Sequence, residues 1–352
     1  MNVKNSDIYR IGSYDIFLNN RIGIGSYSIV YQGRCHDTET INLYNINKSE
    51  MINGKNVSNI IAIKKILIRD VSGKVRKAIN DEINIMKHIK NDPHPNIVKC
   101  YDVIDDIDTI YIIMEYCDSG DLSKIIGRPM KEENVKYYFK QLICGIKYLN
   151  KNKIMHRDIK PKNILLNENK KFLKICDFGL AKTISSNSMT RSYTICGSPL
   201  YMAPEMFGEK SYNDTVDIWS IGILLYEMIY GINPFYKVKD RIELERFMIS
   251  ENDDIIIPPK YSRNDDVSDE CINLMKLLLQ KDAGERITFE DLYVHEWVNK
   301  NNKNNEINLN NDSNNETKSD SDSDYGSLND NKDEYIFDNE DDRMLFLLDT
   351  KK

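Results

Sequence analysis

The sequence lacks the features that mark secreted, membrane-spanning and zinc-binding proteins. Its seven cysteines include no C-x-x-C pair, which argues against a structural zinc site. Residues 1–10 contain no apolar run of the kind that forms a secretory signal, so a disulfide framework is not expected. The most apolar stretch, Ile218 to Ile232, includes Glu227 and is too short to span a bilayer. We therefore predict a cytoplasmic protein with reduced thiols and no membrane span.

A large excess of basic charge is also missing. The formal net charge is −7, and residues 301–352 alone contribute 14 acidic and 6 basic side chains, so the remainder is close to neutral. This balance gives no indication of nucleic-acid binding. The 352 residues, 41% of them apolar, suffice for one large two-lobed domain with a sizeable core.

Three regions follow from the residue patterns. Residues 14–117 are mostly β-rich, with one helical pattern from Lys74 to Ile89, and residues 118–298 are mostly helical. Residues 1–13 form an N-terminal extension, and residues 299–352 form an acidic, mostly disordered tail of low complexity. The pattern predicts an α+β fold in which a small strand-rich lobe precedes a helical lobe, with a cleft between them. The expected strands are Ile22 to Tyr31, Ile60 to Ile68, Val98 to Val103 and Thr109 to Tyr116, and the expected later helices are Glu132 to Asn150, Ser211 to Tyr230, Leu244 to Ser250, Asp269 to Leu279 and Thr288 to Val298.

Residues 35–58 form an unusually long, Asn-rich stretch between two predicted strands. Strands of this kind are normally joined by a short hairpin. We interpret the stretch as an exposed, loop-like insertion in the first lobe, with a docking loop as the functional alternative.

The first candidate functional motif is a glycine-rich segment at residues 23–30. Gly23 and Gly25 lie in the run GIGSYSIV, and glycine allows the backbone N–H groups to approach phosphates closely. Ser28 stands where a third glycine is common in such loops. By itself the segment fits an ordinary hairpin turn equally well.

Lys64 lies in a strand of isoleucine and alanine, where its charge needs a partner. Glu82 on the following helix is available, and a Lys–Glu pair of this kind directs the ammonium toward nucleotide phosphates. The alternative is that both side chains are solvated.

The segment HRDIKPKN carries the strongest signal. Asp158 can accept the proton of an attacking hydroxyl, Lys160 can lie against the γ-phosphate, and Asn163 can bind Mg²⁺. Asp177 in the later sequence DFG can bind the Mg²⁺ that bridges the phosphates. The order of these motifs, followed by the run APE, indicates phosphoryl transfer from ATP with Mg²⁺.

At this point the chain resembles a eukaryotic-type protein kinase domain, from Tyr14 to Val298. The resemblance implies a two-lobed fold, ATP and Mg²⁺ as cofactors, and transfer of the γ-phosphate to Ser or Thr hydroxyls of proteins, because Lys160 follows Asp158 by two residues as in Ser/Thr kinases. It also implies that Arg286 pairs with Glu205. The implied ATP-binding residues are Ile22, Gly23, Gly25, Ser26, Ser28, Val30, Ala62, Lys64, Glu82, Met114, Glu115, Cys117, Asp121 and Leu165.

Three segments are most similar to the autophagy-initiating (Unc-51-like) branch. They are IGSY at residues 11–14, IIMEYCDSGDL at residues 112–122 and TICGSPLYMAPE at residues 194–205. That branch often carries a small residue other than glycine at the position of Ser28. The abundance of Asn, Ile, Lys and Tyr is typical of an AT-rich coding genome, as in some protists and large DNA viruses; a viral protein would act in the host cytoplasm.

Control of activity is expected at the segment before the APE run. The resemblance implies that Arg157 meets a phosphate there, and Thr194 is the expected phosphorylation site, with Ser192 next. The alternative is constitutive activity.

The tail carries a short motif, Tyr325 to Leu328, that follows acidic residues and resembles the segment that adds a strand to ubiquitin-like autophagy proteins. A solvated acidic tail is the alternative, and the apolar run from Met344 to Leu348 could dock on the kinase or on a partner. We expect a monomer. A pseudokinase or scaffold is the competing function, but it would not need Lys64, Asp158, Asn163 and Asp177.

Overall fold

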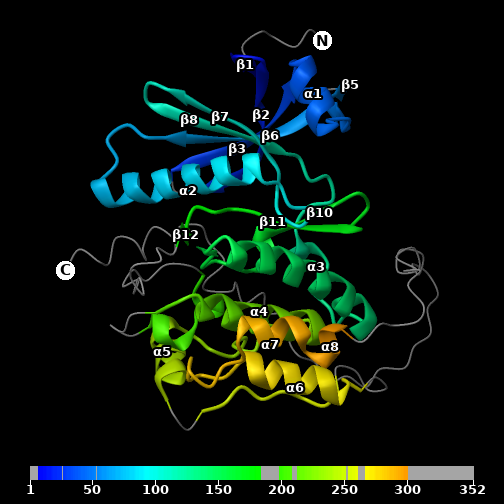
Figure 1. Cartoon of the computed structure of the whole chain (residues 1–352), viewed down its shortest axis with the longest axis vertical. Helices are drawn as coiled ribbons and strands as arrows, with labels where there is room; N and C mark the ends of the chain where they lie inside the picture. The colour runs from blue at the N-terminus through cyan, green and yellow to red at the C-terminus, as the bar shows by residue number, and fades with distance from the viewer. Residues whose placement is uncertain are drawn as a thin grey trace.

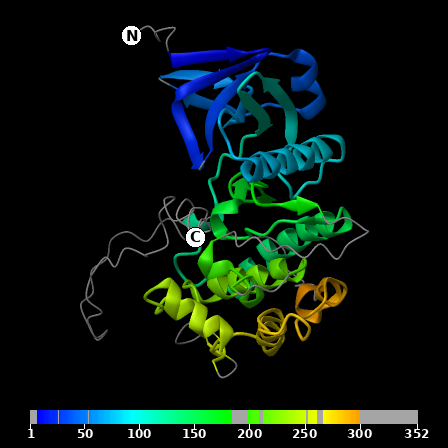
Figure 2. The ribbon, with the colours of Figure 1, turned by 90° about the vertical axis from the view of Figure 1, so that its left-hand side faces the viewer.

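The computed structural model describes residues 7–25, 27–52, 54–183, 198–207, 212–250, 253–260 and 266–299. These residues form two lobes, one above the other in Figure 1. The upper lobe is built on a β-sheet with one long helix, and the lower lobe is mainly helical (Figures 1 and 2). The predicted two-lobed α+β architecture is confirmed.

The sheet of the first lobe has six strands in the order β1-β2-β3-β6-β8-β7, with antiparallel neighbours. The predicted strand Ile22 to Tyr31 is the hairpin end of β2 and β3. Strands β6 and β8 contain few polar residues because their isoleucines are buried on both faces of the sheet. Ile66 and Ile112 belong to the main core with α2, and Ile63 and Ile113 belong to a second core. The bounds are β1 (Ile8–Ile11), β2 (Tyr14–Gly25), β3 (Ser28–Cys35), β6 (Ile60–Leu67), β7 (Cys100–Asp106) and β8 (Thr109–Glu115).

Helix α2 (Gly73–Asn91) covers one face of this sheet (Figure 1). Ser72 caps its first turn by accepting a hydrogen bond from the N–H of Val75. Ile79, Met86 and Ile89 are buried at helical spacing and pack into the main core, as the sequence pattern predicts.

The predicted boundary at residue 14 does not separate an extension from the sheet. Residues 8–11 form β1, which pairs with β2 across a turn in which Gly12 has a φ of 53°. The buried carboxylate of Asp15 holds this edge, because it accepts hydrogen bonds from Arg10 at 2.8 Å and Arg34 at 2.9 Å. His36, at the start of the insertion, lies 2.6 Å from the same carboxylate.

Residues 35–58 form an insertion between β3 and β6, but the insertion is not a simple loop. The segment folds into helix α1 (Thr38–Tyr44) and a hairpin of β4 (Ser49–Ile52) and β5 (Lys55–Ser58). Asp37 caps α1, and Asn45 ends it in the left-handed region with a φ of 53°. The segment is ordered because Ile46 and Ile52 are buried against the first lobe, despite the polar composition around them.

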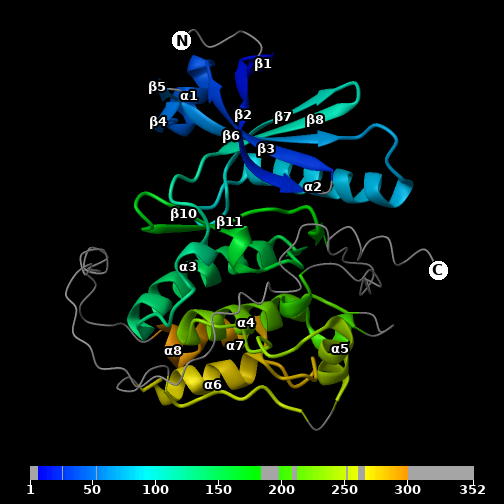
Figure 3. The same cartoon turned by 180° about the vertical axis from the view of Figure 1, so that it is seen from behind.

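The second lobe is organised around α4, whose apolar sequence is buried on almost every side. Gly222 lets α6 approach α4 closely, since a Cβ there would lie 2.7 Å from a methyl carbon of Leu279. Figure 3 shows these helices beneath α3. The bounds are η2 (Leu122–Lys124), α3 (Glu132–Lys151), β9 (Ile154–Met155), η3 (Pro161–Asn163), β10 (Ile164–Asn167), β11 (Phe172–Ile175), β12 (Lys182–Thr183), η4 (Pro199–Tyr201), η5 (Pro204–Met206), α4 (Thr215–Tyr230), α5 (Arg241–Ile249), α6 (Asp269–Leu278), α7 (Phe289–Val294) and α8 (Glu296–Asn299).

Three of the predicted helices differ from the structure. The helix expected from Leu244 begins earlier, at Arg241, because Asp240 caps it by accepting the N–H of Glu243. The helix expected from Ser211 begins at Thr215, whose N–H donates to the side chain of Asn213 and so starts the helix later. The helix expected from Thr288 to Val298 is broken at His295, which has an extended ψ of 138° and accepts a hydrogen bond from the N–H of Trp297. Among the described residues, no helix combines the length and the apolar character that crossing a membrane requires.

Candidate active site

Lys64, Glu82 and Asp177 meet between the two lobes. The ammonium of Lys64 on β6 donates to Glu82 on α2 at 2.6 Å and to Asp177 at 3.1 Å. Burial alone would lower the pKa of Lys64, but the carboxylates of Asp177 and Glu82 outweigh it and raise that pKa. Lys64 is therefore a fixed positive charge at neutral pH, and the pairing predicted from sequence is present in the structure.

The loop at residues 156–163, the predicted catalytic loop, brings Asp158 and Asn163 together. The side-chain N–H groups of Asn163 donate to the backbone oxygen and the carboxylate of Asp158, each at 2.8 Å. Asp158 is only 2% exposed, and the ammonium of Lys160 lies 3.4 Å from its carboxylate. The short η3 turn allows these side chains to converge, because it folds the chain back between Lys160 and Ile164.

Asp217 holds this loop from α4. Its carboxylate accepts the backbone N–H groups of His156 and Arg157, both at 2.7 Å. Arg157 has a φ of 64°, a left-handed conformation that is costly for a non-glycine residue. Burial raises the pKa of Asp217, against the opposing effect of these donors and of His156. The helix predicted from Ser211 to Tyr230 includes Asp217, but the sequence pattern does not indicate its contact with the catalytic loop.

His156 connects the catalytic loop to the segment that precedes Asp177. Its Nε2 lies 3.0 Å from the carbonyl oxygen of Cys176, while its Nδ1 accepts the N–H of Asp158 at 3.3 Å. Both contacts are satisfied together by the neutral tautomer with its proton on Nε2. Asp177 itself has a φ of 62°, so it too is held in the left-handed region. These contacts fix the spacing between Asp158 and Asp177.

Ser198 is a second residue whose role sequence reasoning missed. Its hydroxyl accepts a hydrogen bond from Lys160 at 2.5 Å and donates to Asp158 at 3.2 Å. Its backbone N–H also donates to Asp158, at 3.1 Å. The run GSPLYMAPE contained the residue, but only the fold places it beside the catalytic loop.

Several of the predicted ATP-binding residues lie where the sheet meets the hinge, residues 115–118, which links β8 to the second lobe. Ala62 pairs with Met114 in the β6–β8 ladder, and its side chain is buried. Val30 and Leu165 are half-buried on the two lobes. Half-buried apolar side chains on both sides of the hinge suit a flat heterocycle such as adenine.

The glycine-rich segment is a hairpin whose register pairs Gly23 with Val30 and Gly25 with Ser28. A Cβ on Gly25 would lie 2.9 Å from the hydroxyl of Ser28, so a larger residue there would require the serine side chain to rotate. A hairpin turn is therefore present, and its geometry is compatible with a phosphate-binding role. Ile22 is exposed on β2, and Ser26 lies outside the described residues.

Hinge residues are also fixed by polar contacts. The carboxylate of Glu115 lies 2.9 Å from the ammonium of Lys174 and accepts the side-chain N–H of Asn167 at 3.1 Å. Asp121 accepts the N–H of Ser123 at 3.0 Å at the start of η2. Burial is the main cause of the raised pKa of the Cys117 thiol.

Arg286 and Glu205 form the predicted pair beneath the site. The guanidinium donates two hydrogen bonds to the carboxylate, at 2.8 Å and 3.0 Å, and its central carbon lies 5.4 Å from the centre of the Trp219 ring. Arg286 is only 4% exposed. This bidentate pair anchors the end of the segment that carries Ser198.

A sequence profile described as the protein kinase domain matches residues 17–298. The chain belongs to the protein kinase family. The matched residues include every part of the site described above, from the glycine-rich hairpin to Arg286. Its first-lobe edge strand β1 and the start of β2 precede the matched region.

Curated relatives are serine/threonine-protein kinases. The chain is 39% identical over 303 residues to atg1 of Dictyostelium discoideum, an alignment that covers 83% of this chain and 40% of the relative. It is 33% identical to ATG1c of Arabidopsis thaliana, over 81% of this chain and 35% of the relative. Human ULK3 is 35% identical, over 80% of this chain and 54% of the relative. The resemblance to the autophagy-initiating branch is confirmed, although the chain spans about half or less of these kinases' lengths.

Several predicted features of this kinase lie outside the described residues. They are Thr194 and Ser192 of the segment before the APE run, the Tyr325 to Leu328 motif and the Met344 to Leu348 run. The side chain of Arg157, predicted to meet a phosphate on Thr194, donates from its Nε to the carbonyl oxygen of Leu180 at 2.5 Å.

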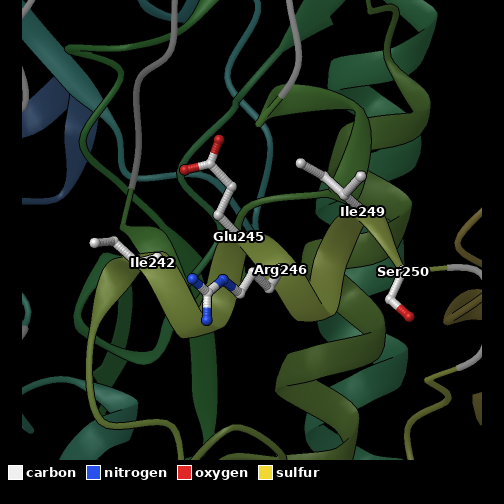
Figure 4. A pocket seen from close by; sticks show the side chains of 5 residues that line it. All are labelled: Ile242, Glu245, Arg246, Ile249 and Ser250. Carbon is white, nitrogen blue, oxygen red and sulfur yellow. The ribbon is translucent and has the colours of Figure 1, made fainter.

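A separate hollow of about 390 Å³ lies beside α5 in the second lobe (Figure 4). It is lined by Ile242, Glu245, Arg246, Ile249 and Ser250. None of these residues belongs to the predicted ATP-binding or catalytic set, so the hollow is distinct from the candidate active site.

Proposed function

We propose that this protein is an active, ATP-dependent serine/threonine kinase that phosphorylates proteins. The observation that carries the proposal is the convergence of Lys64, Asp158, Asn163 and Asp177 between the lobes, with the Lys64–Glu82 pair formed. A scaffold that only binds partners would not need these four side chains to converge in one place.

The residues of the site fit ATP and Mg²⁺. Lys64 is a fixed cation beside Asp177, as binding of the α- and β-phosphates requires. Asn163 uses its N–H groups on Asp158, so its amide oxygen and the carboxylate of Asp177 are the atoms that would ligate Mg²⁺. When bound, Mg²⁺ neutralises charge on the phosphate oxygens.

Asp158 would accept the proton of the substrate hydroxyl and orient that oxygen for attack. Its carboxylate is held by Asn163 and Ser198, so it is pre-positioned rather than mobile. Lys160 would lie against the transferred phosphoryl group and offset its developing negative charge, and its contact with Ser198 keeps it near Asp158. These roles belong to the chain's own side chains.

Transfer of labelled phosphate from ATP with Mg²⁺ to generic protein acceptors tests the proposal. The wild-type protein should label the acceptor on Ser or Thr. An Asp158→Asn variant of unchanged melting temperature should lose activity by at least about a hundredfold, as removal of a general base does. Equal labelling by wild type and this variant would contradict the mechanism.

We propose further that phosphorylation of Thr194 orders the segment before the APE run by engaging Arg157. The position of Arg157, between Asp217 and the carbonyl oxygen of Leu180, supports this proposal because a change at Arg157 would reach the catalytic loop directly.

We also propose partners and a cellular location for this kinase, on the basis of its relatives. The kinase names atg1, ATG1c and ULK3 support a role in initiating autophagy, in the cytoplasm of a cell or of an infected host. Within that proposal, Tyr325 to Leu328 would add a strand to a ubiquitin-like protein, and the kinase would act as a monomer. A peptide of residues 319–330 tests the motif: binding to ubiquitin-like autophagy proteins should be lost on Tyr325→Ala.

A further inference from the structure

The insertion between β3 and β6 reaches across to the hinge and the second lobe. The ammonium of Lys48, just before β4, donates to the carboxylate of Asp118 at 2.5 Å and to the side-chain oxygen of Asn167 at 2.7 Å. Asp118 is in the hinge and Asn167 ends β10 of the second lobe. In both Figure 1 and Figure 3 the insertion lies on the same side of the molecule as β10.

Lys48 joins a polar network that spans the hinge. Asp118 also accepts the hydroxyl of Ser119 at 2.9 Å and the backbone N–H of Glu168 at 3.0 Å. Asn167 in turn donates to Glu115, the last residue of β8. Burial alone would raise the pKa of Asp118, but the hydrogen bond from Lys48 contributes to a net lowering. The positive charge of Lys48 therefore stabilises the negative charge of Asp118.

An apolar contact supports the same arrangement. Ile52 of the inserted hairpin is 7% exposed and forms a small core with Phe17 and Ile60. Val57 of the same hairpin and Tyr116 of the hinge pack against that core. The insertion therefore contacts the hinge in two ways. Tyr116 packs against the small core that includes Ile52, and Asp118 pairs with Lys48.

We propose that Lys48 is a positioning residue for the nucleotide site, and that residues 37–58 brace the hinge. A hinge allows lobe opening because a few of its residues change their φ and ψ angles. Lys48 links the first lobe to Asp118 and Asn167, so opening the cleft requires breaking or stretching these contacts. Removing the link should let the lobes open more readily and let nucleotide leave faster. The inference rests on the proposed kinase function.

The dissociation rate of a fluorescent ADP analogue, measured by stopped flow, tests the brace. Lys48→Met should release ADP about two- to fivefold faster than wild type, the effect expected for a partly exposed ion pair. Lys48→Arg should restore part of the wild-type rate, because a guanidinium can still bridge Asp118 and Asn167. Lys77→Met, an exposed lysine on α2, should match wild type and serves as the control.

A double variant separates this role from a general loss of stability. If Lys48 acts through Asp118, Lys48→Met combined with Asp118→Asn should release ADP no faster than the faster single variant. In steady state, Lys48→Met should raise KM for ATP and leave kcat equal to or above that of wild type. A melting temperature within about 2 °C of wild type shows that the folded state is retained.

The results distinguish the two proposals. If wild type binds no ADP analogue, the kinase function itself fails. If wild type and Lys48→Met release ADP at the same rate, the proposed role of Lys48 at the hinge is contradicted while the kinase function stands. Additive effects of Lys48→Met and Asp118→Asn would likewise overturn the action through Asp118.

Discussion

The carboxylate of Asp217 accepts the backbone N–H of Arg157 at 2.7 Å, and so ties α4 to the catalytic loop. The same carboxylate accepts the N–H of His156 through its other oxygen. A buried acid is costly, and two N–H donors offset part of this cost, since burial still raises the pKa of Asp217. The geometry of the candidate catalytic loop therefore depends on a residue outside the predicted ATP-binding and catalytic set.

Asp217→Asn should lower kcat by about tenfold or more, because an amide N–H₂ group would face one of the two backbone donors. KM for ATP should change little, since Lys64 and the hinge are not affected. Steady-state kinetics with saturating peptide measure both. Asp214→Asn, at the start of the same helix, is the control and should retain wild-type kcat. A normal kcat for a folded Asp217→Asn protein would show that the contact is dispensable.

Ser198→Ala should reduce kcat/KM for peptide substrates by about tenfold, because Lys160 and Asp158 lose a shared hydroxyl. Ser198→Thr keeps the hydroxyl and should retain most of the activity. Peptide phosphorylation at saturating ATP measures the effect. Equal kinetics for the Ala and Thr variants would mean that only the backbone N–H of Ser198 contributes.

Arg286→Lys should destabilise the protein by about 3 kcal/mol, because a lysine cannot replace the bidentate contact and leaves the carboxylate of Glu205 poorly matched. Urea unfolding followed by circular dichroism measures the change. Arg69→Lys, at an exposed pair of Arg69 and Asp70, should change stability by less than about 0.5 kcal/mol. An equal, small effect of both substitutions would contradict the proposed anchoring.

Stability should fall as the pH drops from about 7 to 5, in part through His94. Burial, followed by the nearby charge of Lys174, lowers the pKa of His94 in the folded state. Below pH 6.5 the unfolded chain therefore binds more protons at this residue than the folded chain does, which favours unfolding. His94→Asn keeps an acceptor for the N–H of Asn96 and should show a smaller loss of melting temperature over this range. Parallel pH profiles would exclude a contribution from His94.

Thr194→Ala should reduce the activity of phosphorylated enzyme to that of phosphatase-treated wild type, and Ser186→Ala should not. Mass spectrometry of the active protein should find phosphate on Thr194. Arg157→Ala should remove the dependence of activity on phosphorylation. Full activity of Thr194→Ala would favour constitutive activity, and loss only in Ser192→Ala would move the site to Ser192.

Much of the site was predictable because phosphoryl transfer constrains residues that are close in sequence. Asp158, Lys160 and Asn163 lie within one short loop, so their spacing alone indicates their chemistry. Lys64 and Glu82 were predictable as partners because a charge within an apolar strand requires one. The two-lobed fold followed from the change between strand-like and helical patterns.

Other features could not be predicted because their meaning depends on contacts between distant residues. Ser198 and Asp217 lie in recognisable runs, yet only packing of α4 and the preceding segment against the catalytic loop gives them roles. The polar composition of residues 35–58 is typical of a loop, whereas two buried isoleucines and the cap at Asp37 hold them in a helix and a hairpin. A mean composition does not reveal which few side chains are buried.

The sequence by itself determined the kinase family and the candidate site residues, since their motifs are local and their order is specific. Only the tertiary structure decided how these motifs are held. Lys48 and Asp118 are 70 residues apart, and each would be an ordinary surface charge if the chain did not bring them together. The physical reason is that ion pairs and hydrogen bonds act over a few ångströms in space, while a sequence records only the distance along the chain.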